Sequence, residues 1–135
     1  MIVVDTNVVV YLLLVSPQTA EAEAVWRRDR DWWVPFQLRS EFRNVLAAQV
    51  RQRLIAEAAA FDLMGQAEEL IAGRELRVGS KRILELAFAS GCTSYECEFV
   101  ALAKDLGIRL VTADRKVVAS FPETAVSISG FAAGG

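Results

Sequence analysis

Short apolar runs that stop abruptly at polar residues constrain the fold of this chain more than any other feature. Ile2-Val3-Val4 ends at Asp5-Thr6-Asn7, and these three polar residues favour turns and helix caps. A run that is apolar on both faces is typical of a parallel strand covered on both sides. Further strands are expected at residues 33–35, 76–78, 108–112 and 125–128. Because helical patterns separate them, the sequence predicts a single α/β domain, with a parallel sheet of four to five strands flanked by helices on both faces.

The helical patterns fill the intervals between the expected strands. The apolar run from Val8 to Val15 is ambiguous by periodicity alone, and a strand-to-helix turn at Asp5 fits it best. The other helices are expected over about residues 18–29, 38–53, 56–72, 80–90 and 94–106. Residues 1–131 are therefore expected to form the domain, and residues 132–135 a frayed tail.

Composition excludes several kinds of chemistry. The 135 residues include no histidine, which rules out imidazole bases and histidine-ligated zinc. The net charge of −2 provides no overall attraction for nucleic acid. Cys92 and Cys97 are too few for a disulfide scaffold, and we expect two buried thiols in a reducing compartment. The apolar N-terminal run contains Asp5 and no basic residue before Arg27, unlike a signal peptide, so a soluble cytoplasmic protein with no membrane partner is expected.

Four acidic residues are placed to meet at one edge of the predicted sheet. Asp5 and Asp114 follow two of the strands, and ligand-binding groups collect beyond the carboxyl ends of parallel strands. Helix capping explains each of these two residues equally well. Glu41 and Glu96 lie on the apolar faces of their helices, where a carboxylate is costly unless it is paired or bound to metal, whereas Glu98 is expected to be solvated. Four converging carboxylates would need a hard cation such as Mg²⁺ or Mn²⁺, which suits phosphodiester hydrolysis.

The motifs around these acids resemble those of the PIN-domain superfamily, and within it the VapC-type ribonuclease toxins. The matching stretches are residues 1–7, 34–46, 93–103 and 110–115, which occur in family order and span nearly the whole chain. The resemblance implies a parallel sheet flanked by helices and a Mg²⁺- or Mn²⁺-dependent site that cleaves RNA. It also implies a homodimer that a cognate antitoxin protein holds inactive.

The resemblance assigns roles to individual residues as well. Asp5, Glu96 and Asp114 would bind the metal, and Glu41 would complete the catalytic acids. One position departs from the family pattern, because the third acid is ordinarily aspartate and here is Glu96. A metal site tolerates little misplacement of a carboxylate. We expect Glu96 to bind the metal. The longer side chain has three possible effects, which are slower catalysis, a preference for another metal, and loss of activity.

The resemblance also implies supporting roles for side chains near the acids. Asn7 and Thr112 would orient ligands or water by hydrogen bonds. Arg39, Arg43 and Arg115 flank two of the acids and are candidate contacts for RNA phosphates or an acidic antitoxin segment, although solvated helix charges explain them equally well.

Two alternatives to a toxin ribonuclease remain. One is a PIN nuclease that processes RNA without being a toxin, and an acidic antitoxin-like reading frame directly upstream would argue against it. The other is a catalytically weak or dead PIN-like scaffold that binds RNA or protein. Strong activation by Glu96→Asp, with weak metal binding in the parent, would favour the scaffold.

Overall fold

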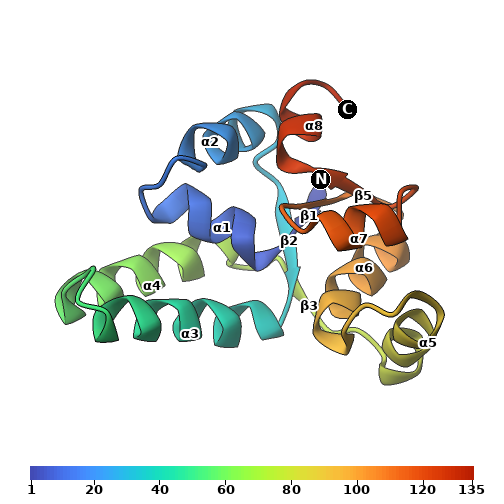
Figure 1. Cartoon of the computed structure of the whole chain (residues 1–135), viewed down its shortest axis with the longest axis horizontal. Helices are drawn as coiled ribbons and strands as arrows, with labels where there is room; N and C mark the ends of the chain where they lie inside the picture. The colour runs from blue at the N-terminus through green and yellow to red at the C-terminus, as the bar shows by residue number, and fades with distance from the viewer.

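The strands form one parallel sheet, as the apolar runs predict. The computed structural model describes residues 1–135 and has the strand order β3-β2-β1-β4-β5 (Figure 1). Every pairing is parallel, so the carboxyl ends of all strands lie at the same edge of the sheet. The strands are β1 (Ile2–Val4), β2 (Trp32–Pro35), β3 (Glu75–Leu76), β4 (Leu110–Thr112) and β5 (Ala125–Ser127).

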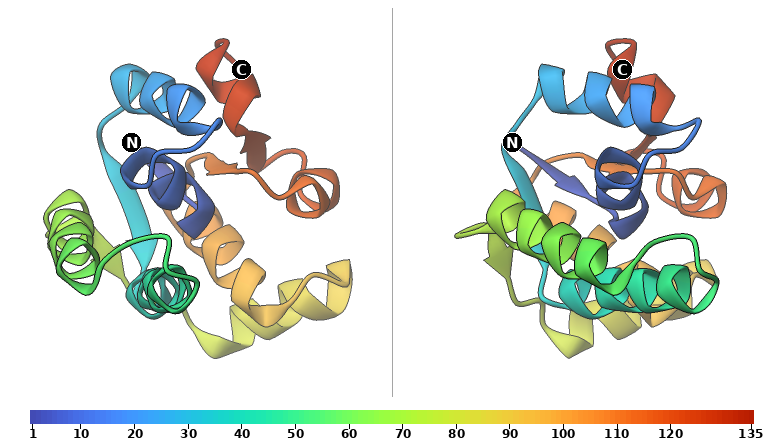
Figure 2. Two further views of the ribbon diagram at one scale, coloured as in Figure 1. Left: turned by 60° about the vertical axis from the view of Figure 1, so that its left-hand side comes forward. Right: turned by 90° about the vertical axis from the view of Figure 1, so that its left-hand side faces the viewer.

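Helices cover both faces of this sheet. Helix α6 packs on β1, β2 and β4 with α5 outside it, whereas α1, α3 and α4 lie on the other side of the strands (Figure 1). Figure 2 shows α3 and α4 side by side and α2 next to α8. None of the helices is both long enough and apolar enough to cross a membrane. The helices are α1 (Thr6–Leu13), α2 (Thr19–Arg28), α3 (Gln37–Arg51), α4 (Glu57–Ile71), α5 (Ser80–Ser90), α6 (Ser94–Leu106), α7 (Arg115–Ser120) and α8 (Ile128–Ala132).

Complete burial of the inner strands explains why β1 and β4 lack any polar alternation. Val3, Val4, Leu110 and Val111 are fully inaccessible to solvent. Strands buried on both faces have no solvent side on which a polar residue is favoured. The run Ile2-Val3-Val4 could therefore sit only in the middle of a covered sheet, and β1 is the central strand.

Some expected boundaries are wrong because local contacts override the apolar pattern. The strand expected at residues 76–78 lies at Glu75–Leu76, where β3 pairs with β2. Ile128 belongs to α8 rather than to β5, because the Ser127 hydroxyl caps that helix by accepting a hydrogen bond from the amide of Gly130. Of the residues expected to be frayed, the first is the last residue of α8, and the amide of Gly135 donates to the Gly130 carbonyl.

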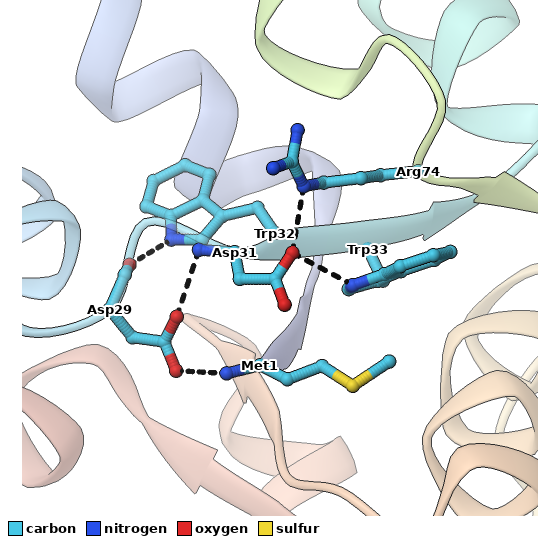
Figure 3. A network of polar contacts seen from close by, with 6 residues as sticks. All are labelled: Met1, Asp29, Asp31, Trp32, Trp33 and Arg74. Atoms are coloured by element: carbon cyan, nitrogen blue, oxygen red, sulfur yellow. Dashed lines mark hydrogen bonds and ion pairs between the residues drawn. The ribbon is translucent and has the colours of Figure 1, made fainter.

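A polar network fastens the amino ends of β1 and β2, at the opposite edge from the predicted acids (Figure 3). The Met1 ammonium lies 2.5 Å from Asp29, and the Asp29 carboxylate also accepts from the amide of Asp31. Asp31 in turn accepts from the indole of Trp33 and the guanidinium of Arg74. The hydrogen bond from Arg74 lowers the pKa of Asp31. Both acids of this network, Asp29 and Asp31, are therefore paired with a positive charge.

Candidate active site

The carboxyl edge of the sheet carries a cleft of about 470 Å³. All four acids predicted from the sequence line it, although they come from four separate parts of the chain. The parallel topology explains the convergence, because it brings the loops after β1 and β4 to the same edge as the second turn of α3 and the first turn of α6. The lining residues are Asp5, Thr6, Asn7, Val10, Tyr11, Glu41, Asn44, Val45, Glu96 and Asp114.

Asp5 is both a helix cap and a member of the cleft. Its Oδ1 accepts a hydrogen bond from the amide of Thr6 at 2.7 Å, and this bond caps α1. Its Oδ2 accepts from the hydroxyl of Thr112, also at 2.7 Å. Burial raises the pKa of Asp5, and the nearby charges of Asp114 and Glu96 raise it further, whereas the two hydrogen bonds lower it. The carboxylate thus occupies an unfavourable position that capping alone does not explain.

Thr112 connects Asp5 to Asp114. The buried Thr112 hydroxyl donates to Asp5 and accepts from the amide of Asp114 at 3.0 Å. Oδ1 of Asp114 caps α7 by accepting from the amides of Lys116 and Val117 at 2.9 and 3.3 Å. Its Oδ2 accepts no hydrogen bond within the chain. Each of these two acids therefore has its position fixed by a cap and by one shared threonine.

Glu41 reaches the cleft from α3, where Thr6 holds it. Its Oε1 accepts a hydrogen bond from the Thr6 hydroxyl at 2.7 Å. Burial raises the pKa of Glu41, the Thr6 bond opposes this, and the charges of Asp5 and Glu98 add to the increase. Thr6 is a site residue that the sequence does not reveal, because a threonine in the first turn of a helix is also an ordinary capping residue.

Asn7 has a structural role at the rim of the cleft. Its side-chain oxygen accepts a hydrogen bond from the amide of Ala113 at 3.1 Å. This contact links the first turn of α1 to the turn between β4 and α7. Asn7 thereby holds the two acid-bearing loops together.

Glu96 divides its two carboxylate oxygens between a cap and the cleft. Oε1 accepts from the amide of Thr93 at 3.2 Å, and the Thr93 hydroxyl accepts from the amide of Glu96 at 3.1 Å. This reciprocal pair is a capping box at the start of α6. Oε2 is buried and has no hydrogen-bond partner in the chain. A buried carboxylate oxygen without a partner is costly, so it needs a ligand from outside the chain.

The cleft is negatively charged and no basic side chain neutralises it. All six ion pairs of the chain involve other acids. No three acidic or thiol side chains lie close enough together to surround an ion by themselves. Mg²⁺ keeps several waters when protein carboxylates bind it, so a few carboxylate oxygens suffice. The unpartnered oxygens of Glu96 and Asp114 beside Asp5 fit such an ion in their chemistry.

The predicted arginines do not share one environment. The guanidinium of Arg39 donates two hydrogen bonds to Glu75, at 2.8 and 2.6 Å, and one to Glu68 at 2.5 Å, and it does not line the cleft. Arg43 lines a separate groove between α3 and α4, and Arg115 is exposed at the start of α7. The ion pairs of Arg39 provide a structural reason for its presence that needs no RNA.

Glu98 is not fully solvated, contrary to the sequence-based expectation. It is half-buried beside residues of α5, and burial raises its pKa. It also lies near enough to Glu41 to raise the pKa of that residue. The helical pattern of α6 alone does not reveal the residues of α3 and α5 that lie beside Glu98.

Comparison with known proteins decides the family. The model of the PIN domain matches residues 2–125, a range that contains all four acids of the cleft. This chain belongs to the PIN-domain family. The PIN-domain chain is 27% identical over 126 residues to Ribonuclease VapC3 of Pyrobaculum aerophilum, covering 90% of this chain and 95% of that relative.

Two solved structures have the fold of this PIN domain. PAE2754 from Pyrobaculum aerophilum matches with a TM-score of 0.74 and 20% identity, over 98% of this chain and 93% of that one. FitAB bound to an IR36 DNA fragment matches with a TM-score of 0.75 and 18% identity, over 96% of each chain. The resemblance drawn from the motifs and the predicted fold are both confirmed.

Proposed function

We propose that this PIN-domain protein is a Mg²⁺- or Mn²⁺-dependent endoribonuclease and the toxin of a VapBC-like toxin–antitoxin pair. The proposal rests on a cleft that is lined by four carboxylates and by no lysine or arginine. One oxygen of Glu96 in this cleft is buried without a hydrogen-bond partner. Similarity to Ribonuclease VapC3 supports RNA as the substrate. An enzyme that cleaves cellular RNA would act in the cytoplasm.

We assign the metal to Asp5, Glu96 and Asp114, which would hold it partly through water molecules, because the three carboxylates do not by themselves surround an ion. A divalent ion bound there would supply an activated water and would neutralise charge on the scissile phosphate. Thr112 keeps Asp5 and Asp114 in a fixed relation through its two hydrogen bonds. Fixed ligand positions matter because metal affinity depends on ligand geometry.

Glu41 is the proton acceptor in this proposal. Thr6 occupies its Oε1, so its Oε2 stays available to take a proton from the attacking water. The raised pKa of Glu41 makes the carboxylate a stronger base than an exposed glutamate. Thr6 holds the side chain in place through the change in charge.

RNA and protein partners would use surfaces outside the four-acid cleft. We propose that the exposed Arg43 and Arg115 contact RNA phosphates, whereas Arg39 is already bound to acids of its own chain. The groove between α3 and α4, of about 510 Å³, has mostly apolar walls and an exposed Phe61. An apolar surface of this kind supports a protein partner, either the antitoxin or a second subunit of a homodimer.

Cleavage of a labelled structured RNA tests the enzyme proposal directly. The protein is purified free of any co-expressed partner and assayed with and without Mg²⁺ or Mn²⁺. We expect metal-dependent cutting that Asp5→Asn abolishes and Glu123→Gln, which changes an exposed acid outside the cleft, leaves unchanged. No cutting of several RNAs, together with no Mn²⁺ binding by calorimetry, would replace the nuclease with an inert scaffold.

A separate experiment tests the toxin proposal. We expect expression of the parent protein to arrest growth, and co-expression of a small acidic protein encoded immediately upstream to relieve the arrest. A nuclease that cuts RNA in vitro without affecting growth would instead be an RNA-processing enzyme.

A further inference from the structure

A second hollow lies beside the acidic cleft, between α3 and α6, which approach each other at this edge (Figure 2). It shares Glu41 and Asn44 with the cleft, so the two spaces are contiguous. It is broad and open to solvent, with a volume of about 560 Å³. Its walls are formed by Gln37, Ser40, Glu41, Asn44, Tyr95 and Glu98.

Polar groups in this hollow are available to a ligand. The side chains of Ser40 and Asn44 are exposed and form no hydrogen bond within the chain. Glu98 is half-buried, yet it accepts no hydrogen bond and forms no ion pair. Gln37 donates its amide to the carbonyl of Tyr95 at 2.6 Å, which leaves its side-chain oxygen unused. Unused polar groups that converge on one space are typical of a binding site.

Tyr95 provides an aromatic surface at the rim. It is 67% exposed, which is unusual for a large ring beside a cleft. Its backbone is anchored by the hydrogen bond from Gln37 and by the capping box that begins two residues earlier at Thr93. An exposed aromatic ring on an anchored backbone is what proteins use to stack on an unpaired RNA base.

Charge decides which part of an RNA the hollow accepts. Glu41 and Glu98 contribute two carboxylates, and the walls contain no lysine or arginine. A phosphate would be repelled, whereas a base edge that offers N–H donors would be attracted. Among the four bases only guanine presents two adjacent donors, N1–H and the 2-amino group, on its Watson–Crick edge. This pair matches the two oxygens of one carboxylate.

We propose that the hollow binds an unpaired guanine next to the scissile phosphate, with its ring stacked on Tyr95 and its donor edge on the carboxylate of Glu98. The inference rests on the proposed ribonuclease function and gives that enzyme a base preference. Glu41 and Asn44 line both spaces, so a guanine in the hollow would lie next to the cleft. Tyr95 and Glu98 are specificity residues here and take no part in bond cleavage.

The first experiment maps cleavage sites of the parent on an unstructured RNA by sequencing the fragments. We expect guanine to be enriched at one fixed position beside the cut. Replacing that guanine by inosine, which lacks the 2-amino group, is expected to raise KM about tenfold. Glu98→Gln is expected to remove most of this difference, because an amide offers only one acceptor. No base enrichment at any position beside the cut would overturn the proposal.

Matched variants test the stacking surface. Tyr95→Ala is expected to raise KM about tenfold while kcat changes less than about threefold, since loss of one stacking ring weakens binding by about that factor. Tyr95→Phe keeps the ring and is expected to stay within about twofold of the parent. Phe88→Ala is the control, because Phe88 is 80% exposed on α5 and does not line the hollow. Equal KM values for Tyr95→Ala and Phe88→Ala would overturn the proposal.

Binding measurements separate this inference from the function on which it rests. RNA affinity is measured by fluorescence anisotropy in the Asp5→Asn background, where no cleavage occurs, and Tyr95→Ala should weaken it about tenfold. Normal metal-dependent cutting with unchanged affinity would refute the guanine site and leave the nuclease intact. A parent that neither cuts nor binds RNA would refute both.

Discussion

Replacing Asp5 by asparagine is expected to stabilise the metal-free protein at neutral pH. The Asp5 carboxylate is buried near Asp114 and Glu96, and burial and repulsion together raise its pKa. An acid whose pKa is higher in the folded than in the unfolded state makes folding less favourable wherever it is ionised. Asparagine removes the charge and keeps the shape. A gain in stability that accompanies loss of activity is expected of a functional carboxylate.

The size of the gain follows from what asparagine keeps and loses. Asparagine caps a helix about as well as aspartate, so its oxygen can still accept from the amide of Thr6. Its NH₂ can donate to the hydroxyl of Thr112, which already accepts from the amide of Asp114. Loss of a negative charge at the start of α1 costs about 0.3–1 kcal/mol. Relief of burial and repulsion exceeds this cost, and we expect a net gain of about 1–2 kcal/mol.

The pH dependence identifies the source of the gain. The pKa of Asp5 in the folded protein lies above its ordinary value of 3.8, so the parent becomes more stable as the pH falls through the folded pKa. The advantage of Asp5→Asn is therefore greatest near pH 7 and disappears as the pH approaches 3.8. A gain that is constant with pH would have another cause.

The change in stability is measured in EDTA by thermal unfolding, with circular dichroism as the signal. A gain of 1–2 kcal/mol corresponds to an increase in Tm of about 3–8 °C for a domain of this size. Added Mn²⁺ is expected to raise the Tm of the parent and not that of the variant. Asp31→Asn is the control and is expected to lower the Tm, because the hydrogen bond from Arg74 lowers the pKa of Asp31 and its charge therefore stabilises the fold. A variant Asp5→Asn that melts below the parent at pH 7 in EDTA would refute the reasoning.

Three further substitutions test individual contacts that stabilise the fold and the site. Thr112→Val removes the hydroxyl between Asp5 and the amide of Asp114, and urea denaturation should show a loss of about 2–3 kcal/mol. Arg39→Met breaks the two hydrogen bonds to Glu75 and is expected to lower stability by about 1 kcal/mol without raising KM for RNA; an increase in KM would assign Arg39 to the substrate. Gly91→Ala, at φ 74° after α5, should lower the unfolding free energy by about 1 kcal/mol in the same assay.

The sequence predicts where an acid lies when a single strand end or a single helix determines the position of that residue. Asp5 and Asp114 could be placed because the apolar runs before them mark where the strands end. Glu41 and Glu96 could be placed because helical periodicity determines which residues share a face. Each of these inferences uses only local pattern and the shared polarity of parallel strands. The structure accordingly brings these four acids to one cleft.

Contacts between distant elements explain what the sequence does not predict. The hydrogen bond between Thr6 and Glu41 joins α1 to α3 across 35 positions of sequence, and neither helix alone indicates it. Glu98 is only half-exposed because it lies beside residues of α5 and α3, which the periodicity of α6 does not indicate. The two-residue strand β3 is determined by pairing with β2, which lies about 40 residues earlier. Register and coverage are properties of pairs of elements, so one element's pattern cannot fix them.

Glu96 has two roles, one in capping α6 and one in the acidic cleft. Glutamate is the residue that a capping box prefers at this position, and Glu96, which lines the cleft, uses one oxygen for the cap and leaves the other buried without a partner. Aspartate is shorter by one methylene, so a carboxylate directed into the cleft could no longer reach the amide of Thr93. Glu96→Asp is therefore expected to lower the unfolding free energy by about 0.5–1 kcal/mol, the usual value of one capping bond.

A double-mutant cycle with Thr93→Ala isolates the capping role of Glu96. Thr93→Ala removes the hydroxyl half of the cap and leaves the Glu96 carboxylate untouched. If the cap accounts for the stability effect of Glu96→Asp, the double variant should lose less than the sum of the two single variants, measured by urea denaturation. Strictly additive losses would mean that Glu96 stabilises α6 by some other contact. Mn²⁺ affinity, measured by calorimetry on the same four proteins, should follow the residue at position 96 and be indifferent to Thr93, because only the carboxylate oxygen in the cleft faces the metal in our proposal.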